Sequence, residues 1–291
     1  MPRHDIIHTV FQTDLLRVID HRCAGLDNVR GEVPQDFEIV LPRAGAFERW
    51  NARGECLADP NQVLFFNRGE PYDINHPIQG GDSSTIFVVA PFLLLEIAQA
   101  HNPTVEDDPR NIFPHSHFTL NSRLQVLQYR LLRETQPADA LEIEEEIIAA
   151  VDEILRAHYQ STPKPRKESA SAMSDRAEQV SAVKTFLNAN VGANLQLENI
   201  SSAVHLSPFH LCRVFKREVG MTIHQYVNRL RLFNAAERMV ENPVTRLDVL
   251  ALDFGFANHG HFTTAFRKLF GINPSEFRGS SFRQMRSVLN T

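Results

Sequence analysis

The chain has 291 residues, 43% of them hydrophobic, and a formal net charge of −5. This length is about twice that of a typical domain and the apolar content is ample for packed cores, so we expect two domains. The apolar run 91–95 is short and is followed by Glu96, which argues against a membrane span. The polar start, Met1 to Asp5, predicts no signal peptide.

The charge is distributed unevenly along the chain. Residues 175–291 contain 14 Lys and Arg against 9 Asp and Glu, which leaves +5, whereas residues 1–174 contain 16 against 26, which leaves −10. A basic module beside an acidic one is typical of a DNA-binding domain attached to a different domain. Ordinary solvent-exposed surface could have the same charges, so the charge distribution alone does not show that residues 175–291 bind DNA.

Residues 1 to about 110 are predicted to form mainly β-strands. Short runs rich in β-branched, aromatic and aliphatic residues are separated by turn signals such as Asp59-Pro60-Asn61 and 79–82. Short strands with frequent turns favour a small barrel or sandwich. The predicted strands are 15–19, 37–41, 62–66, 72–76 and 83–90.

The hydrophobic period becomes helical from 118 to 159, where Pro137 separates two apolar stripes. These stripes predict two amphipathic helices. The next segment, 161–174, is rich in Pro, Ser and charged residues, and is predicted to be a linker that lets the two domains move. The predicted organisation is therefore 1–160, the linker 161–174, and a helical domain 175–291.

The helical domain contains one unit written twice. The segment His210 to Gly220 aligns with His261 to Gly271, 51 positions further on. In each copy a short apolar helix and a tight turn precede the longer helix, and the turns contain His205 and Gly255. Glycine accepts positive φ without strain, and histidine does so more readily than most other residues. This arrangement predicts two helix-turn-helix units, the second with a turn one residue longer.

The ends of the two longer helices carry matching signals. Ser207 is a suitable N-cap before Pro208, and Gly220 ends the first helix. Asn258 and Gly271 have the same roles in the second. The predicted buried stripes consist of Leu211, Val214, Phe215 and Val219 in the first helix and of Phe262, Ala265, Phe266 and Phe270 in the second.

The segments 206–216 and 255–274 resemble the DNA-binding domain of the AraC/XylS family of transcription regulators, in which a long helix joins two helix-turn-helix units. The resemblance covers about a third of the chain, and the joining helix is predicted from Thr222 to Val240. The N-terminal strands look like the cupin-like sensory domain of such regulators, through strand order and the segment Phe65 to Tyr72. The implied fold class is α+β: a cupin-like β-barrel, a helical dimerisation segment at 118–159, and an all-α double helix-turn-helix domain.

The resemblance also implies which residues meet DNA. Arg213 could donate two hydrogen bonds to guanine, while Phe209 and threonine methyl groups could contact thymine methyls. The base-contacting set is Phe209, Cys212, Arg213, His259, Gly260, Thr263 and Thr264, and the phosphate-contacting set is Lys216, Arg267 and Lys268.

The candidate effector pocket consists of Phe65, Tyr72 and His76. On a strand, period two places Tyr72 and His76 on one face, so His76 is a candidate polar anchor for a small molecule. The alternative is a core histidine whose hydrogen bonds are satisfied within the protein.

No catalytic residue, metal site or cofactor is predicted. Cupin enzymes hold a metal with a histidine pair and a carboxylate, and this pattern is absent from the sequence. His115 and His117 flank Ser116, but no Cys or carboxylate set lies nearby at ligand spacing. The odd number and wide spacing of the cysteines indicate free thiols in a reducing cytoplasm; they are Cys23, Cys56 and Cys212.

We therefore expect a cytoplasmic, sequence-specific transcription regulator, either activator or repressor, rather than an enzyme. The expected partners are double-stranded DNA, a small-molecule effector and a second copy of the chain, with RNA polymerase as a candidate and no membrane. Two alternatives remain open, a cupin-type metalloenzyme fused to a helical interaction module and a helical module that binds no DNA. The second would not explain the paired caps, turns and basic residues.

Overall fold

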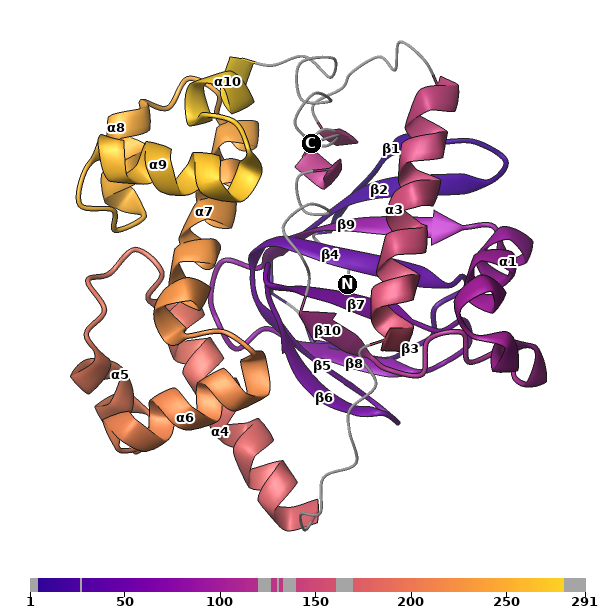
Figure 1. The fold of residues 1–291 in the computed structure, drawn as a ribbon, viewed down its shortest axis with the longest axis horizontal. Coiled ribbons are helices and arrows are strands. Elements are labelled where there is room, and N and C mark those ends of the chain that lie inside the picture. Colours follow the sequence, from indigo (N-terminus) through magenta and orange to yellow (C-terminus); the bar gives the residue numbers. More distant parts are fainter. Residues whose placement is uncertain are drawn as a thin grey trace.

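The computed structural model describes residues 5–26, 28–119, 127–129, 131–132, 140–160 and 170–279, with the backbone alone for 170–173. A β-rich N-terminal part packs against a helical C-terminal part (Figure 1). This is the predicted α+β class. Within the described ranges, no helix is both long enough and apolar enough to cross a membrane.

The N-terminal part contains two antiparallel sheets. The larger has the strand order β1-β2-β9-β4-β7-β10 and the smaller the order β3-β8-β5-β6. No strand pair among the described residues joins the two sheets, so the predicted cupin-like barrel is not closed. The strands are Ile6–Gln12 (β1), Leu16–Cys23 (β2), Val29–Glu32 (β3), Glu38–Gly45 (β4), Phe47–Asn51 (β5), Gly54–Ala58 (β6), Gln62–Phe66 (β7), Tyr72–Asn75 (β8), Asp82–Val89 (β9) and His117–Thr119 (β10).

The larger sheet has a core on each of its faces. Because side chains alternate along a strand, Phe65 and Phe66 of β7 point to opposite faces. Phe65 belongs to the core that the helices α1 (Pro91–His101) and α3 (Ala140–Gln160) cover, and the 3-10 turn η1 (Pro103–Asp107) follows α1. Phe66 packs with Phe47 and other residues in a smaller core on the opposite face.

The five predicted strands are confirmed to within four residues at each end, and 62–66 matches β7 at both ends. The sequence did not indicate β1, β3, β5, β6, β10 or α1. The prediction of helix from residue 118 is wrong at 118–119, which belong to β10, whereas 127–129, 131–132 and α3 are helical. The predicted linker 161–174 is too long, because α4 begins at Ala170; its residues 161–169 lie outside the described residues.

The apolar side chains of α3 pack into the core of the same chain. Ile143, Ile147, Val151 and Ile154 are all buried in the core beneath α1 and α3. Leu141 alone of the predicted stripe is strongly exposed, at 63%. The dimerisation segment at 118–159 therefore remains a prediction.

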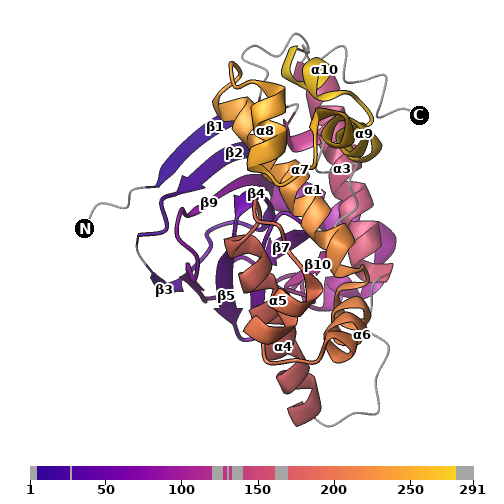
Figure 2. The same ribbon diagram turned by 90° about the vertical axis from the view of Figure 1, so that its left-hand side faces the viewer.

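The C-terminal part is built around α7, which lies between two groups of helices (Figures 1 and 2). One half of α7 contributes Tyr226 and Leu230 to the core of the first helix-turn-helix unit, and the other half contributes Phe233 and Met239 to the core of the second. The helices are Ala170–Ala189 (α4), Leu197–Ala203 (α5), Pro208–Val219 (α6), Ile223–Glu241 (α7), Leu247–Asp253 (α8), His259–Phe270 (α9) and Pro274–Gly279 (α10).

Helix α7 also packs against the larger sheet through a buried ion pair. Arg43 of β4 donates from Nε to Glu237 Oε2 of α7 at 3.0 Å, and Arg43 also pairs with Asp20 of β2. Burial alone would lower the pKa of Arg43, but the charges of Glu237 and Asp20 raise it above its ordinary value. Arg43 is therefore charged at any physiological pH.

Hydrogen bonds join the other end of α7 to the N-terminal part. The Tyr226 hydroxyl donates to the carboxylate of Asp59, and Arg229 Nε donates to Asn61 Oδ1 at 2.8 Å. Burial, and then the charge of Asp59, raise the pKa of Tyr226 well above its usual value. Both ends of α7 are thus held against the N-terminal part, a contact that the sequence did not predict.

Candidate nucleic-acid interface

Helices α6 and α9 begin and end where the sequence predicted. In α6 the Ser207 hydroxyl accepts a hydrogen bond from the backbone N–H of His210 at 3.3 Å. In α9 the Asn258 side chain accepts from the N–H of His261 at 2.8 Å. Both helices end at a left-handed glycine, Gly220 at φ 80° and Gly271 at φ 76°. These caps fix which residues lie on the outer face of each helix.

The two turns share one hydrogen-bond pattern. The N–H of Leu206 donates to the carbonyl of Ser201 at 3.0 Å, and 50 positions on the N–H of Phe256 donates to the carbonyl of Ala251 at 2.9 Å. Gly255 has φ 71°, and His205, at φ 55°, is the one non-glycine residue of the described part with positive φ. The predicted turn positions are confirmed, and the second turn is one residue longer.

The outer face of α6 carries the predicted DNA-contacting residues. Phe209 is 76% exposed, and Cys212, Arg213 and Lys216 are also exposed. The predicted apolar stripe of this helix is buried on the opposite side. The exposed face of α6 therefore presents one apolar ring beside two cations, a combination that can contact both a thymine methyl group and phosphate oxygens.

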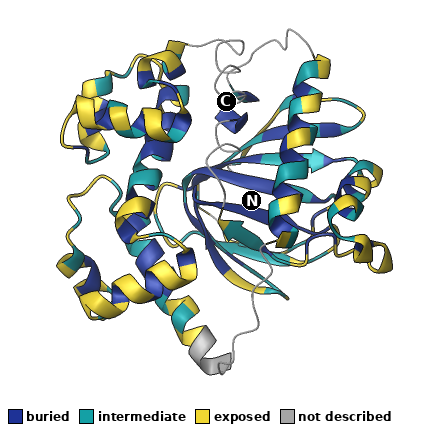
Figure 3. Cartoon of the chain, in the orientation of Figure 1, coloured by how far each residue is buried: buried dark blue, intermediate teal, exposed yellow. Residues whose placement is uncertain are grey.

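The outer face of α9 is smaller and more polar. His259, Gly260 and Thr264 are exposed, whereas Thr263 is half-buried with its hydroxyl oxygen buried. The Thr264 hydroxyl donates to the carbonyl of Gly260 at 3.0 Å, so its methyl group is what it presents outward. Figure 3 shows exposed residues along the sides of both helix-turn-helix units that are turned away from the sheets.

Four cations on these faces are uncompensated. The side chains of Arg213, Lys216, Arg267 and Lys268 are exposed and make no hydrogen bond or ion pair with another residue that the structure describes. By contrast, Arg217 lies 3.4 Å from Glu218. Exposed cations that no described carboxylate neutralises are suited to contacts with phosphate groups.

The three candidate effector residues do not line one cavity. The Phe65 ring lies in the helix-covered core, 4.8 Å from Phe113. Tyr72 packs edge-on against Phe66, in the smaller core between the sheets. His76 follows β8 and bonds Asp82 through Nε2 at 3.0 Å. The set as a whole remains a prediction.

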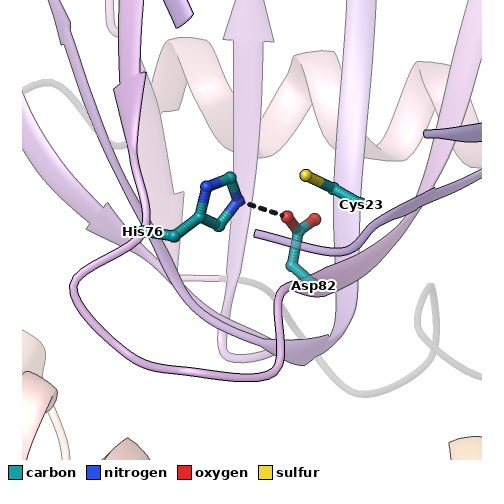
Figure 4. Close-up of side chains that lie close together, drawn as sticks. All are labelled: Cys23, His76 and Asp82. Carbon is teal, nitrogen blue, oxygen red and sulfur yellow. Dashed lines mark hydrogen bonds and ion pairs between the residues drawn. The ribbon is translucent and has the colours of Figure 1, made fainter. Parts of the chain in front are cut away.

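His76 belongs to a cluster that the sequence did not indicate. Cys23, His76 and Asp82 bring one potential ligand atom each within 4.8 Å of one another (Figure 4). The hydrogen bond with Asp82, and then that with Cys23, raise the pKa of His76 to about 10. No spacing along the sequence points to this cluster, because it depends on how the two sheets are placed.

His115 and His117 are not part of any such group within the described residues. His117 Nδ1 lies 3.0 Å from the hydroxyl of Ser116, and burial lowers its pKa to about 3. His115 packs against the ring of His158, with 5.4 Å between the ring centres. The two imidazoles thus have different surroundings, a hydroxyl for His117 and an aromatic ring for His115.

Comparisons with known proteins agree with the geometry of the C-terminal part. A model of a helix-turn-helix domain matches residues 200–280. The chain is 35% identical over 96 residues to the probable transcription factor PqrA of Proteus vulgaris, covering 33% of this chain and 76% of PqrA. It is 30% identical over 135 residues to the bifunctional transcriptional activator/DNA repair enzyme AdaA of Bacillus subtilis, covering 46% of this chain and 63% of AdaA.

Solved structures add little to this. An AraC-type regulator from Chromobacterium violaceum is 27% identical, covers 37% of this chain and 93% of its own, and has a TM-score of 0.34. Fatty acid-bound ToxT from Vibrio cholerae is 12% identical, covers 92% of this chain and 98% of its own, and has a TM-score of 0.36. Both scores lie below 0.5, so nothing further follows from them.

The match to PqrA extends over most of that protein, whereas the match to AdaA covers less than two thirds of its length. The family model covers the part of the chain that holds the two capped outer helices and the two matching turns, residues 200–280. The chain belongs to the AraC/XylS family of transcription regulators.

Proposed function

We propose that the chain is a sequence-specific DNA-binding regulator that inserts α6 and α9 into successive major grooves. The observation that carries this proposal is the pair of capped outer helices at the two ends of α7, with four cations on their exposed faces that pair with no other described residue. Successive major grooves on one face of DNA lie roughly 34 Å apart, so a stiff joining helix would hold both outer helices in phase with the duplex.

Base reading and phosphate contact fall to different residues in this proposal. Arg213 and Phe209 supply base contacts on the first unit, and His259 and Thr264 supply them on the second. The phosphate set is Lys216, Arg267 and Lys268. Thr263 is the weakest member of the base-contacting set because its hydroxyl is buried.

The direct test begins with selection of genomic fragments that the full-length chain retains. Binding to a selected duplex and to a scrambled duplex is then measured across a salt series. We expect preference for the selected duplex and a linear fall of log affinity with log salt concentration. Equal affinity for both duplexes at every salt concentration would contradict sequence-specific recognition.

We further propose that the N-terminal part controls DNA binding in response to a small molecule. The support is that α7, which holds both DNA-facing units, is anchored to β4 through Arg43 and Glu237. A ligand changes such an equilibrium only through its different affinity for the two states. Ligand screening by thermal shift, followed by DNA titration with each hit, tests this; hits that stabilise the chain but leave DNA affinity unchanged would contradict it.

The proposal also covers the oligomeric state, the cellular location and the protein partners. By family resemblance we propose a homodimer, a cytoplasmic location and RNA polymerase as a candidate partner. Sedimentation of the full-length chain at micromolar concentration tests the dimer. A monomer at all concentrations would contradict it, and would agree with the burial of the α3 stripe within the chain.

A further inference from the structure

We propose that Cys23, His76 and Asp82 form a binding site for one divalent metal ion of the Zn²⁺ type. Thiolate, imidazole and carboxylate are the ligand types that zinc accepts in proteins. A bound metal ion would displace the proton from His76 Nε2, and with Cys23 and Asp82 deprotonated the three ligands then carry two negative charges, which matches a dication. Three protein ligands leave a fourth coordination position for water or a small molecule.

The register of the larger sheet brings two of the ligands together. Cys23 at the end of β2 pairs directly with Asp82 at the start of β9, and directly opposed residues project to the same face of a sheet. That face is the inner one, because Ile86, further along β9 with the same parity, packs in the core between the sheets. His76 reaches the same point from the end of β8 in the smaller sheet.

The ligand atoms are close to the spacing that a metal requires. The three atoms lie within 4.8 Å of one another, and His76 Nε2 is 3.0 Å from Asp82 Oδ1. Tetrahedral zinc with ordinary bond lengths separates its nitrogen, oxygen and sulfur ligands by about 3.3–3.6 Å. Small side-chain movements therefore suffice, and in Figure 4 the imidazole Nε2, the carboxylate and the sulfur point toward one another.

Two of the ligands have supporting partners. The Ser84 hydroxyl donates to Asp82 Oδ2 at 3.1 Å and leaves Oδ1 for the cluster, while the backbone N–H of Gly25 donates to Cys23 Sγ at 3.3 Å. Outer hydrogen bonds of this kind orient metal ligands. The side chains of His76 and Asp82 are only 3% and 4% exposed, so they are held in a site with little access for competing water.

Two glycines beside the cluster, Gly45 and Gly81, have no room for a side chain. A Cβ on Gly81 would lie 1.9 Å from the carbonyl oxygen of Cys23, and a Cβ on Gly45 would lie 2.1 Å from the carbonyl oxygen of Gly81. These close approaches lock the end of β2 against the loop that leads from His76 to Asp82. The site is therefore rigid before any metal arrives, which limits the entropy lost on binding.

The competing explanation is a metal-free His76–Asp82 ion pair with Cys23 as a neighbour. The two explanations differ in whether sulfur bonds to a metal. The experiment uses the full-length chain, reduced and stripped with a chelator, and titrates it with Zn²⁺ alone and with Co²⁺ alone. We expect one equivalent to bind, and the Co²⁺ form to show near-ultraviolet absorption from sulfur-to-cobalt charge transfer.

Variants assign that absorption to the cluster. Cys23→Ser should abolish it, whereas the matched control Cys212→Ser, which removes the exposed thiol of α6, should leave it intact. Ser84→Ala removes a supporting hydrogen bond only and should weaken Zn²⁺ affinity about 10–100-fold. Circular dichroism checks the fold of each variant, and the wild-type spectrum tests the proposal without any variant.

Three results would overturn the proposal: wild-type chain that binds less than one equivalent, a Co²⁺ form without the charge-transfer absorption, or absorption that survives Cys23→Ser and is lost in Cys212→Ser. The last result would place the metal on the exposed thiol. Each of these outcomes is independent of DNA binding.

Discussion

The two helix-turn-helix units have the same backbone geometry but differ in the side chains that form their cores and turns. The first unit has a mixed core in which aliphatic residues such as Leu211 and Val214 predominate, and a turn that contains a histidine. The second has a core dominated by phenylalanines and a turn that contains a glycine. The second also receives Tyr129 of the N-terminal part, which donates from its hydroxyl to the carbonyl of Phe233 at 3.2 Å. One geometry can therefore be specified by different side chains, and each unit has its own contact with the N-terminal part, through Tyr129 in the second and through the Tyr226–Asp59 hydrogen bond in the first.

The largest expected loss of stability comes from a substitution in the aromatic core of the second unit. Phe266 is fully buried, 4.3 Å from Phe270 and 5.2 Å from Phe277 between ring centres. Phe266→Ala should lower the free energy of unfolding by about 3–5 kcal/mol, and Leu211→Ala in the first unit by about 2–5 kcal/mol. Denaturant unfolding of the full-length chain measures both. A larger loss for Leu211→Ala than for Phe266→Ala would contradict the expected order.

Substitutions in the two turns should differ in how strongly they destabilise the protein. Gly255→Ala places a Cβ at positive φ, 2.8 Å from the guanidinium of Arg231 and 2.9 Å from the carbonyl oxygen of Gly192. We expect a loss of about 1–3 kcal/mol in the free energy of unfolding. His205→Gly, the matched change in the first unit, relieves a positive φ and should alter stability by less than about 1 kcal/mol. Equal losses at both turns would contradict this assignment.

The outer faces should differ in base reading. Arg213→Ala removes a side chain able to donate twice to guanine, and should cost about 1–3 kcal/mol on the selected duplex with a smaller loss on a scrambled one. Thr264→Val keeps the methyl group and removes a hydroxyl already bonded to Gly260, so it should change affinity much less. Binding titrations on both duplexes measure this. Equal losses on both duplexes for Arg213→Ala would make it a phosphate contact.

The smallest expected effect is common to both units. Lys216→Ala in the first and Lys268→Ala in the second each remove one uncompensated cation. Each should weaken binding to all sequences alike and reduce the slope of log affinity against log salt concentration by about one unit. The salt series on both duplexes measures the slope. An unchanged slope would mean that the side chain faces solvent in the complex.

The helix-turn-helix units were predictable because their signals are local. Ser207, Asn258, Gly220 and Gly271 act on backbone groups within a few residues, and the repeat doubles each signal. Helix α1 was missed because its start, 91–95, is continuously apolar and shows no clear helical period. Strand β5 has the sequence FERWN, in which two adjacent charged residues interrupt the alternation of apolar and polar residues that indicates a strand.

Long-range contacts were not predictable from the sequence. Arg43 and Glu237 appear as ordinary solvent-facing charges until the fold buries them against each other. Likewise Cys23 and Asp82 become neighbours only through the register of β2 with β9. The candidate effector residues failed to converge for a related reason, since the face on which Phe65 lies depends on which side of the sheet the helices cover.

The Arg43–Glu237 pair has a consequence for synthesis on the ribosome. The two residues are 194 positions apart, and at roughly 5–20 residues per second Arg43 leaves the ribosome about 10–40 s before its partner. During that interval Asp20 can neutralise Arg43, but the surface that will receive α7 stays hydrated and uncovered. Docking of α7 therefore comes long after the sheet residues have emerged, and helices α8 to α10 follow α7 still later, so a nascent chain exposes its sheets well before it carries both units that meet DNA.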